Sequence, residues 1–162
     1  MTDDIIRDAA TRVLAACRVH GLKVATAESC TGGLVAGALT EVPGSSDVLD
    51  RGFVTYSNAA KEAMLGVPTS ILERHGAVSR ETADAMATGA LAMSNVDLVV
   101  AITGIAGPGG GTPEKPVGLV WIAIHGSDAK ARRFHLVGDR AEIRQRAAQA
   151  ALEMVRRTLA KG

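Results

Sequence analysis

Two hydroxyl side chains lie where a predicted strand passes into a predicted helix. The segment is Thr26-Ala-Glu28-Ser29-Cys30-Thr31-Gly32-Gly33. Backbone N–H groups at the start of a helix have no intrahelical partner, so they can bind an anion or a developing oxyanion. Ser29 and Thr31 would then lie at the edge of an anion site. The structural alternative is a serine N-cap followed by glycines that allow close packing.

A lysine among small apolar residues follows the next predicted strand. The segment Tyr56-Ser57-Asn58-Ala-Ala-Lys61 places it one helical turn beyond the strand. A lysine in a weakly polar pocket loses part of its preference for the charged form, and the neutral amine can accept a serine proton. The alternative is a solvated surface lysine. Further hydroxyls in Gly44-Ser45-Ser46-Asp47 are typical of a turn or a helix cap.

A glycine-rich loop follows the apolar run 97–103. It begins Gly104-Ile-Ala-Gly107-Pro-Gly109-Gly-Gly and ends at Pro116. Glycines after a buried strand let a ligand approach the backbone closely. The spacing fits neither a P-loop, which needs a lysine where Gly110 stands, nor a GxGxxG loop. It indicates a lid or a binding loop, with a mobile structural loop as the alternative.

Two arginines, Arg140 and Arg144, lie in the first turns of the last predicted helix. Cations at this end oppose the helix dipole. Both side chains would also project near the apolar stripe of the helix. This placement indicates either an anionic ligand or an internal carboxylate partner.

The elements that must position these residues follow from apolar periodicity and from turn residues. Together they predict one three-layer α/β/α domain over residues 1–162. Its sheet is mixed and mostly parallel: the first three strands are parallel and the sheet ends in an antiparallel hairpin. Strands are expected over 22–28, 51–57, 97–103, 117–124 and 129–136; helices are expected over 3–20, from the 29–33 segment to about 40, from a cap at Asn58, over 68–74, from a cap at Ser79 to about 93, and over 139–159.

Composition excludes several classes of protein. The 162 residues carry a formal net charge of +1 and 2% aromatic residues, which argues against direct nucleic-acid binding. No apolar run approaches the roughly 18–20 residues of a membrane span, and the acidic N-terminus is unlike a signal peptide. The chain is therefore expected to be cytoplasmic. Cys17 and Cys30 predict free thiols, and the scattered histidines predict no metal site.

Taken together, these segments resemble the C-terminal domain family of the competence-damage-inducible protein CinA, which also occurs as stand-alone nicotinamide-nucleotide amidohydrolases. The matching blocks span nearly the whole chain in order. They are 26–33, 43–46, 52–58 with Lys61, 76–79, 101–110 and 115–118. The combination is far more specific than any single block. In longer members of the family, a molybdopterin-binding-like domain precedes this unit.

The resemblance implies hydrolysis of the carboxamide of nicotinamide mononucleotide, which gives nicotinate mononucleotide and ammonia. It implies a Ser/Lys mechanism that needs neither metal nor cofactor. We expect Ser29 as the nucleophile, with Ser46 as the runner-up. Lys61 would act as general base and then as general acid, while Tyr56 would relay the proton or hold the lysine.

Substrate contacts are expected from three regions. The phosphate would lie against helix-start amides, the glycine-rich loop and one of the two arginines, Thr31 and Thr103 would orient the amide or the phosphate, and Glu28 would orient a ribose hydroxyl or tether Lys61. The full set is Glu28, Thr31, Gly32, Gly33, Thr103, Gly104, Gly107, Gly109, Arg140 and Arg144. Alternative functions are a nucleotide-binding module without turnover and a competence or DNA-damage accessory protein. A homo-oligomer is left open, and no membrane partner is expected.

Overall fold

The computed structural model describes residues 2–161 as five strands flanked by six helices and one short 3-10 helix. The strands are β1 (Val24–Glu28), β2 (Leu49–Val54), β3 (Leu98–Gly104), β4 (Leu119–His125) and β5 (Ala129–His135). The helices are α1 (Thr2–His20), α2 (Leu34–Thr40), η1 (Ser45–Asp47), α3 (Asn58–Leu65), α4 (Thr69–His75), α5 (Arg80–Met93) and α6 (Arg140–Ala160).

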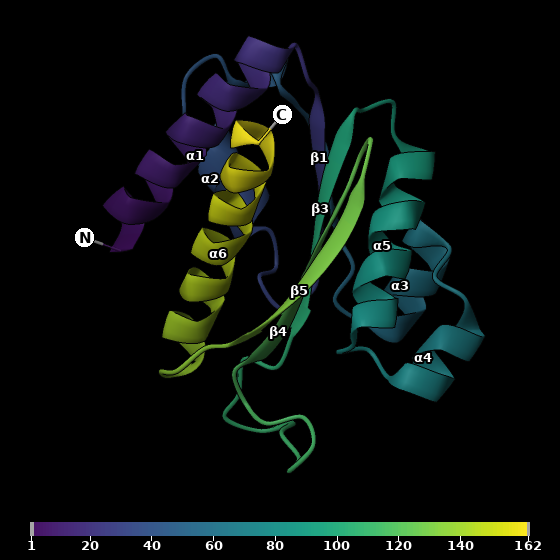
Figure 1. The fold of residues 1–162 in the computed structure, drawn as a ribbon. Helices are drawn as coiled ribbons and strands as arrows, with labels where there is room; N and C mark the ends of the chain where they lie inside the picture. The colour runs from purple at the N-terminus through teal and green to yellow at the C-terminus, as the bar shows by residue number, and fades with distance from the viewer. Residues whose placement is uncertain (1, 162) are drawn as a thin grey trace.

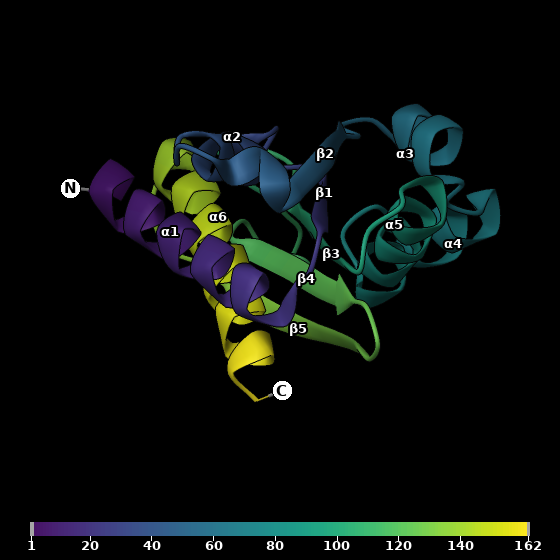
Figure 2. The ribbon, with the colours of Figure 1, turned by 90° about the horizontal axis from the view of Figure 1, so that it is seen from above.

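The sheet has the strand order β2-β1-β3-β4-β5. Strands β2, β1 and β3 are parallel, whereas β4 and β5 run antiparallel to their neighbours. Helices α1, α2 and α6 cover one face, and α3, α4 and α5 cover the other (Figures 1 and 2). The predicted three-layer mixed α/β fold is therefore confirmed.

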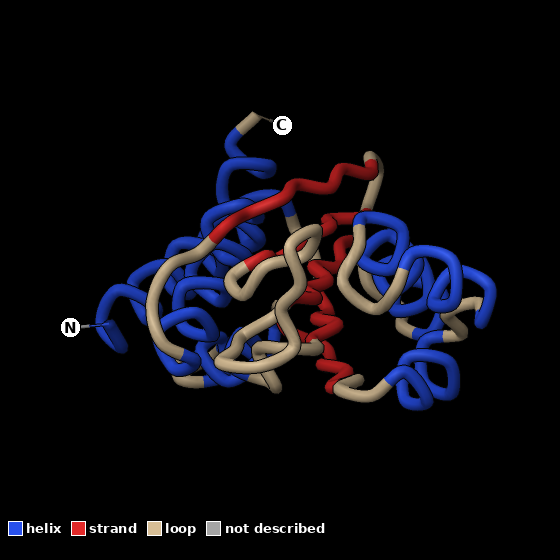
Figure 3. Tube along the Cα trace, turned by 90° about the horizontal axis from the view of Figure 1, so that it is seen from below, coloured by secondary structure: helices blue, strands red, loops and turns tan. Residues whose placement is uncertain are grey.

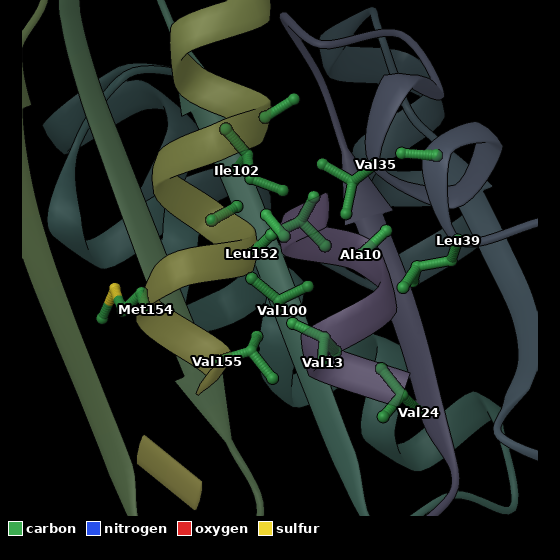
Figure 4. Close-up of a cluster of buried hydrophobic side chains, with 14 of the residues drawn as sticks. Ala10, Val13, Val24, Val35, Leu39, Val100, Ile102, Leu152, Met154 and Val155 are labelled. Carbon is green, nitrogen blue, oxygen red and sulfur yellow. The ribbon is translucent and has the colours of Figure 1, made fainter. Parts of the chain in front are cut away.

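A separate apolar core fills each side of the sheet. On the first side, the buried stripes of α1 and α6 pack on β1 and β3 through residues such as Val13, Val100, Ile102 and Leu152 (Figure 4). On the second side, α5 packs closely because the contacts are made largely by alanine and by Met86. Helices therefore pack against both faces of the sheet, and the ends of the strands remain available to form a site.

Two element boundaries differ from the sequence prediction near the candidate site. Strand β2 ends at Val54 and not at Ser57, because Ser57 instead caps α3 by accepting a hydrogen bond from the amide of Ala60. The expected cap, Asn58, is the first helical residue. The second helix begins only at Leu34, so Ser29 lies in a turn that Gly32 and Gly33 close with positive φ angles.

The carboxyl ends of β1, β2 and β3 lie at the same end of the sheet, since these strands are parallel. The glycine-rich loop after β3 and the first turn of α6 gather at that end too (Figure 3). In the described part of the chain, no helix combines the length and the apolarity needed to cross a membrane.

Candidate active site

Ser29 and Lys61 meet at the carboxyl ends of β1 and β2. Ser29 immediately follows β1, and Lys61 is in the first turn of α3. The Lys61 Nζ lies 3.0 Å from the Ser29 Oγ, and it also contacts the carbonyl oxygens of Thr55 at 3.0 Å and Tyr56 at 3.3 Å. The lysine side chain is only 1% exposed. The surface alternative for Lys61 is therefore excluded.

The surroundings of Lys61 favour its neutral form. Burial lowers the pKa of the amine, opposed only by the nearby Cys30 thiol. Within residues 2–161, no carboxylate lies within ion-pair distance of Lys61 to restore the charge. A neutral amine has two N–H groups and one lone pair. In that form Lys61 can donate its N–H groups to the two carbonyls and accept the proton of the Ser29 hydroxyl with its lone pair, whereas the charged form donates a third N–H to the Ser29 Oγ.

Cys30 is next to this pair but does not compete with Ser29 as a nucleophile. Burial raises the pKa of its thiol to about 11. Because the thiolate is the reactive form, a thiol with such a pKa stays protonated and unreactive at neutral pH. Ser29, with a base at hydrogen-bond distance, is the nucleophile that this geometry activates.

A cavity of about 210 Å³ opens onto Ser29 and Lys61. Its polar boundary includes Tyr56 and Arg140, and Ala77, Val78 and Ala106 supply apolar surface. Thr103 and Gly104, at the end of β3, complete the wall. The Thr103 hydroxyl donates to the carbonyl of Ala77 at 2.7 Å, so it fixes the loop before α5.

Glu28 lies behind this cavity and caps α2 from inside the fold. Its carboxylate is fully buried and accepts hydrogen bonds from the amides of Gly33, Val35 and Ala36 at 3.0–3.2 Å. The hydroxyl of Thr31 donates to the same carboxylate at 2.7 Å. The predicted contact of Glu28 with a ribose hydroxyl or with Lys61 is therefore wrong, because its oxygens already bind the helix start.

The amides at the start of α2 are consequently closed to a substrate phosphate. Glu28 occupies the anion site that the sequence suggested, and the Gly32 amide donates to the Ser29 carbonyl. The prediction that Thr31, Gly32 and Gly33 contact the ligand through these groups is therefore wrong. The Thr31 hydroxyl and the Gly33 amide bind Glu28, and the Gly32 amide binds the Ser29 carbonyl. Within residues 2–161, the amides of Cys30 and Thr31 donate to no other residue, so they are the donors that this turn leaves for an oxyanion.

Arg140 and Arg144, in the first turns of α6, form no ion pair with a carboxylate of the described side chains. Arg144 donates to the carbonyls of Cys30 at 3.1 Å and Thr31 at 3.2 Å, and it thereby holds the turn that carries Ser29. Arg140 bridges the Gly107 carbonyl and the Tyr56 hydroxyl, each at 2.7 Å. The expectation of an internal carboxylate partner is wrong. Arg140, at the edge of the cavity, is the arginine placed to meet a ligand.

The glycine-rich loop contributes unevenly to the site. Gly104 lines the cavity, and a side chain there would meet the Leu119 carbonyl oxygen at 2.9 Å. Gly107 accepts the bond from Arg140, as described above. Gly109 does not line the cavity, and nothing lies within 4 Å of where its Cβ would be. The structure therefore brings Gly104 to the cavity of Ser29 and Lys61, whereas Gly107 contacts it only through Arg140 and Gly109 does not line it.

Ser46 lies at the opposite end of the sheet. It belongs to η1, which precedes β2, whereas Ser29 follows the parallel strand β1. It is exposed and lines a different cavity of about 340 Å³ with Asp50 and Arg51. A five-residue strand separates the two ends by about 16 Å. The runner-up nucleophile is therefore out of reach of Lys61.

Three contributions to the site were missed from the sequence. The carbonyl of Thr55 holds Lys61, and Ala77 and Val78 form an apolar wall. The block Gly76-Ala-Val-Ser79 was noted only as part of a family pattern, because it offers no reactive side chain. Among the described residues, no three or more histidine, cysteine or acidic side chains lie together in a way that could hold a metal ion.

Comparison with known proteins identifies close relatives of this chain. The family model described as "CinA C-terminal domain" matches residues 6–159. A putative competence-damage inducible protein of Caldicellulosiruptor bescii is 52% identical over 85% of this chain and 34% of its own length. A CinA-like protein of Akkermansia muciniphila is 53% identical over 81% of this chain and 32% of its own length. The chain spans about a third of the length of the curated relatives it matches.

Solved structures show the same fold. The competence/damage inducible protein of Agrobacterium tumefaciens has 52% identity and a TM-score of 0.92, covering 96% of each chain. A competence-damaged protein superfamily member from Escherichia coli has 34% identity and a TM-score of 0.85, covering 99% of this chain and 90% of its own.

Proposed function

Since the chain belongs to the CinA C-terminal domain family, we propose that it is a serine amidohydrolase that deamidates nicotinamide mononucleotide. The products are nicotinate mononucleotide and ammonia. The observation that carries the proposal is the 3.0 Å contact between the Lys61 Nζ and the Ser29 Oγ, made by a buried lysine without a carboxylate partner in the described chain. This is the geometry that Ser/Lys nucleophilic catalysis needs.

The first half of the reaction forms an acyl-enzyme. Lys61 takes the proton of the Ser29 hydroxyl as the Oγ attacks the carboxamide carbon. The tetrahedral intermediate collapses when Lys61 returns that proton to the amide nitrogen. The carbon–nitrogen bond breaks, ammonia leaves, and the nicotinoyl group remains as an ester of Ser29.

In the second half, water is the nucleophile and Ser29 is the leaving group. Water replaces ammonia in the cavity, and Lys61 removes a proton from it as it attacks the ester. The acid is released, and Lys61 returns the proton to Ser29. In both halves, the amides of Cys30 and Thr31, which donate to no other described residue, bind the oxyanion. Because a serine and an amine supply nucleophile and base, the cycle requires no metal ion.

Substrate orientation follows from the shape of the cavity. The carboxamide enters toward Ser29, and the pyridine ring lies against the apolar wall of Ala77, Val78 and Ala106. The phosphate then reaches the mouth, where the guanidinium of Arg140 is held by Tyr56 and Gly107. A guanidinium binds phosphate through paired, charge-assisted hydrogen bonds. Arg140 exchanges at least one of its two present partners for the phosphate.

The direct test is ammonia release from nicotinamide mononucleotide by the purified chain, with and without a chelator. We expect turnover that survives the chelator, and mass mapping of a quenched reaction should place the acyl group on Ser29. Lys61→Ala should abolish turnover, whereas Lys23→Ala, an exposed lysine, should not change it. Substrate binding without ammonia release would favour the nucleotide-binding module, and neither binding nor release would favour the accessory protein.

A further inference from the structure

A second hollow, lined by four basic side chains, lies between β5 and the C-terminal part of α6. We call it the basic cavity; its volume is about 260 Å³. Lys130 and Arg132 come from β5, Arg157 lies in the last turn of α6, and Lys161 is the C-cap that follows this helix. Ala131 and Met154 add apolar surface between them. The hairpin end of β5 and the C-terminal end of α6 lie at the same end of the molecule (Figure 1).

The charges of the basic cavity are not neutralised by the protein. No carboxylate within residues 4–161 lies at ion-pair distance from any of the four. The acidic residue one turn before Arg157 is Glu153, and its carboxylate is bound by Arg156 at 3.0 Å. Arg146, elsewhere on the same helix, pairs with Glu142. Arg157 acts on Glu153 only through a longer-range attraction, so the four cations line one hollow without an ion-pair partner among the described side chains.

Two ordinary explanations account for each pair of cations but not for their convergence. Lysine and arginine on an edge strand discourage sheet-to-sheet aggregation, and cations in a last helical turn complement the helix dipole. Neither effect requires the two pairs to line the same cavity. Arg132 is also positioned, since its guanidinium lies 5.0 Å from the centre of the Phe134 ring.

The spacing of the four cations suits a compact polyanion. Alternate residues of a strand lie about 6.8 Å apart on one face, and residues four apart on a helix lie about 6 Å apart. Lys130 and Arg132 have the first relation, and Arg157 and Lys161 have the second. We propose that the basic cavity binds a small ligand with two or more linked phosphate groups, such as the triphosphate of a nucleotide.

A nucleic-acid chain fits these observations less well. Single-stranded nucleic acids are held in grooves that combine cations with aromatic stacking surfaces. The lining of the basic cavity has no aromatic residue, and the hollow is small. The site is also independent of the proposed active site. Helix α6 has 21 residues and spans about 30 Å, with Arg140 at one end and Lys161 at the other.

The test is calorimetric titration of the whole chain with inorganic triphosphate at physiological salt. We expect saturable binding of one triphosphate per chain, weakened at least tenfold by the double variant Arg132→Gln/Arg157→Gln. The matched control is Arg74→Gln, an exposed arginine of α4 without an ion pair in the described residues, which should bind triphosphate as the parent does. Equal weakening by the control, or no saturation, would overturn the proposal.

Two further measurements separate the remaining outcomes. Orthophosphate should bind at least tenfold more weakly than triphosphate, because it reaches only part of the cluster; equal affinity would overturn a polyphosphate site. Tighter binding of a single-stranded oligonucleotide would assign the cavity to nucleic acid instead. Without ligand, the double variant should unfold at the same temperature as the parent or at a higher one. Its rate of ammonia release should equal that of the parent, both with and without triphosphate.

Discussion

Two serines in glycine-flanked turns, Ser29 and Ser46, lie in very different surroundings. Ser29 follows β1, is 7% exposed, and contacts a buried amine. Ser46 precedes β2, is exposed, and shares its cavity with the ion pair of Asp50 and Arg51. Both serines carry the same hydroxyl, but only Ser29 lies next to a base whose charged form is disfavoured by burial. The comparison shows that position along a parallel strand decides which serine can react.

The sharpest way to break this comparison is to remove each hydroxyl. Ser29→Ala and Lys61→Ala should each lower kcat by about 10⁴-fold or more, and the double variant should lose little beyond that, because the two residues act as a unit. Ser46→Ala should stay within about threefold of the parent, since it removes no group from the catalytic cavity. Steady-state ammonia release measures all four. Additive losses at Ser29 and Lys61, or a large loss at Ser46, would contradict the assignment.

The next effect concerns the carboxylate that holds the Ser29 turn. In Glu28→Gln, an amide NH₂ group would face backbone donors of α2 that now bind a carboxylate. We expect unfolding free energy to fall by about 2–3 kcal/mol and kcat to fall more than KM changes, because the turn shifts relative to Lys61. Denaturant unfolding and kinetics measure this. Glu41→Gln, which loses only an exposed contact with Arg7, is the matched control; an equal effect there would contradict the role of Glu28.

The pH dependence sharpens the comparison further. Since burial lowers the pKa of Lys61 from its ordinary 10.5, the neutral base becomes available well before that pH. Below the lowered pKa, kcat/KM should rise about tenfold per pH unit, and it should level off before pH 10.5. Profiles from pH 6 to 10 for the parent and for Ser46→Ala should coincide. A flat profile over this range would exclude Lys61 as the base.

The smallest expected effect is on stability. Below the lowered pKa, the folded and unfolded chains both carry a protonated Lys61, and the fold bears the full cost of the buried charge. Between the lowered pKa and 10.5, the folded chain has released the proton that the unfolded chain still binds, so the parent gains stability as pH rises. Relative to Lys61→Met, the Tm of the parent should therefore increase with pH across this window. Lys23→Met should show no such trend, and a parent that loses Tm relative to Lys61→Met would contradict a lowered pKa.

The sequence predicted the fold well because its signals are local. Apolar periodicity located α1, α5 and α6 to within a residue or two, and Ser79 caps α5 as expected. The end of β2 and the start of α2 were predicted wrongly, because Ser57 and Glu28 make hydrogen bonds that apolar periodicity does not reveal. The same limit applies to the site. Residue types indicated a lysine and a serine, but strand direction alone separates Ser29 from Ser46.

The arginines were the least predictable part. Their position in the first turns of α6 was clear, but their partners are carbonyl oxygens of Cys30, Thr31 and Gly107, residues far away in the chain. A backbone carbonyl has no sequence signature. Arg144 therefore binds neither of the partners that the sequence led us to expect, a carboxylate or a ligand. The binding of Glu28 to the amides at the start of α2 was not predicted either. In a sequence, an acidic residue that binds a helix start cannot be told from one that contacts a ligand.

The bonds from α6 to the Ser29 turn have a consequence for biosynthesis. Ser29 and Lys61 leave the ribosome before Arg140 and Arg144, which follow them in the sequence. A nascent chain that has emerged only through β5 has the nucleophile and its base without the guanidinium groups that fix the turn and the mouth. Translation thus delays the assembled site until α6 has been made, and a chain released before α6 lacks that support.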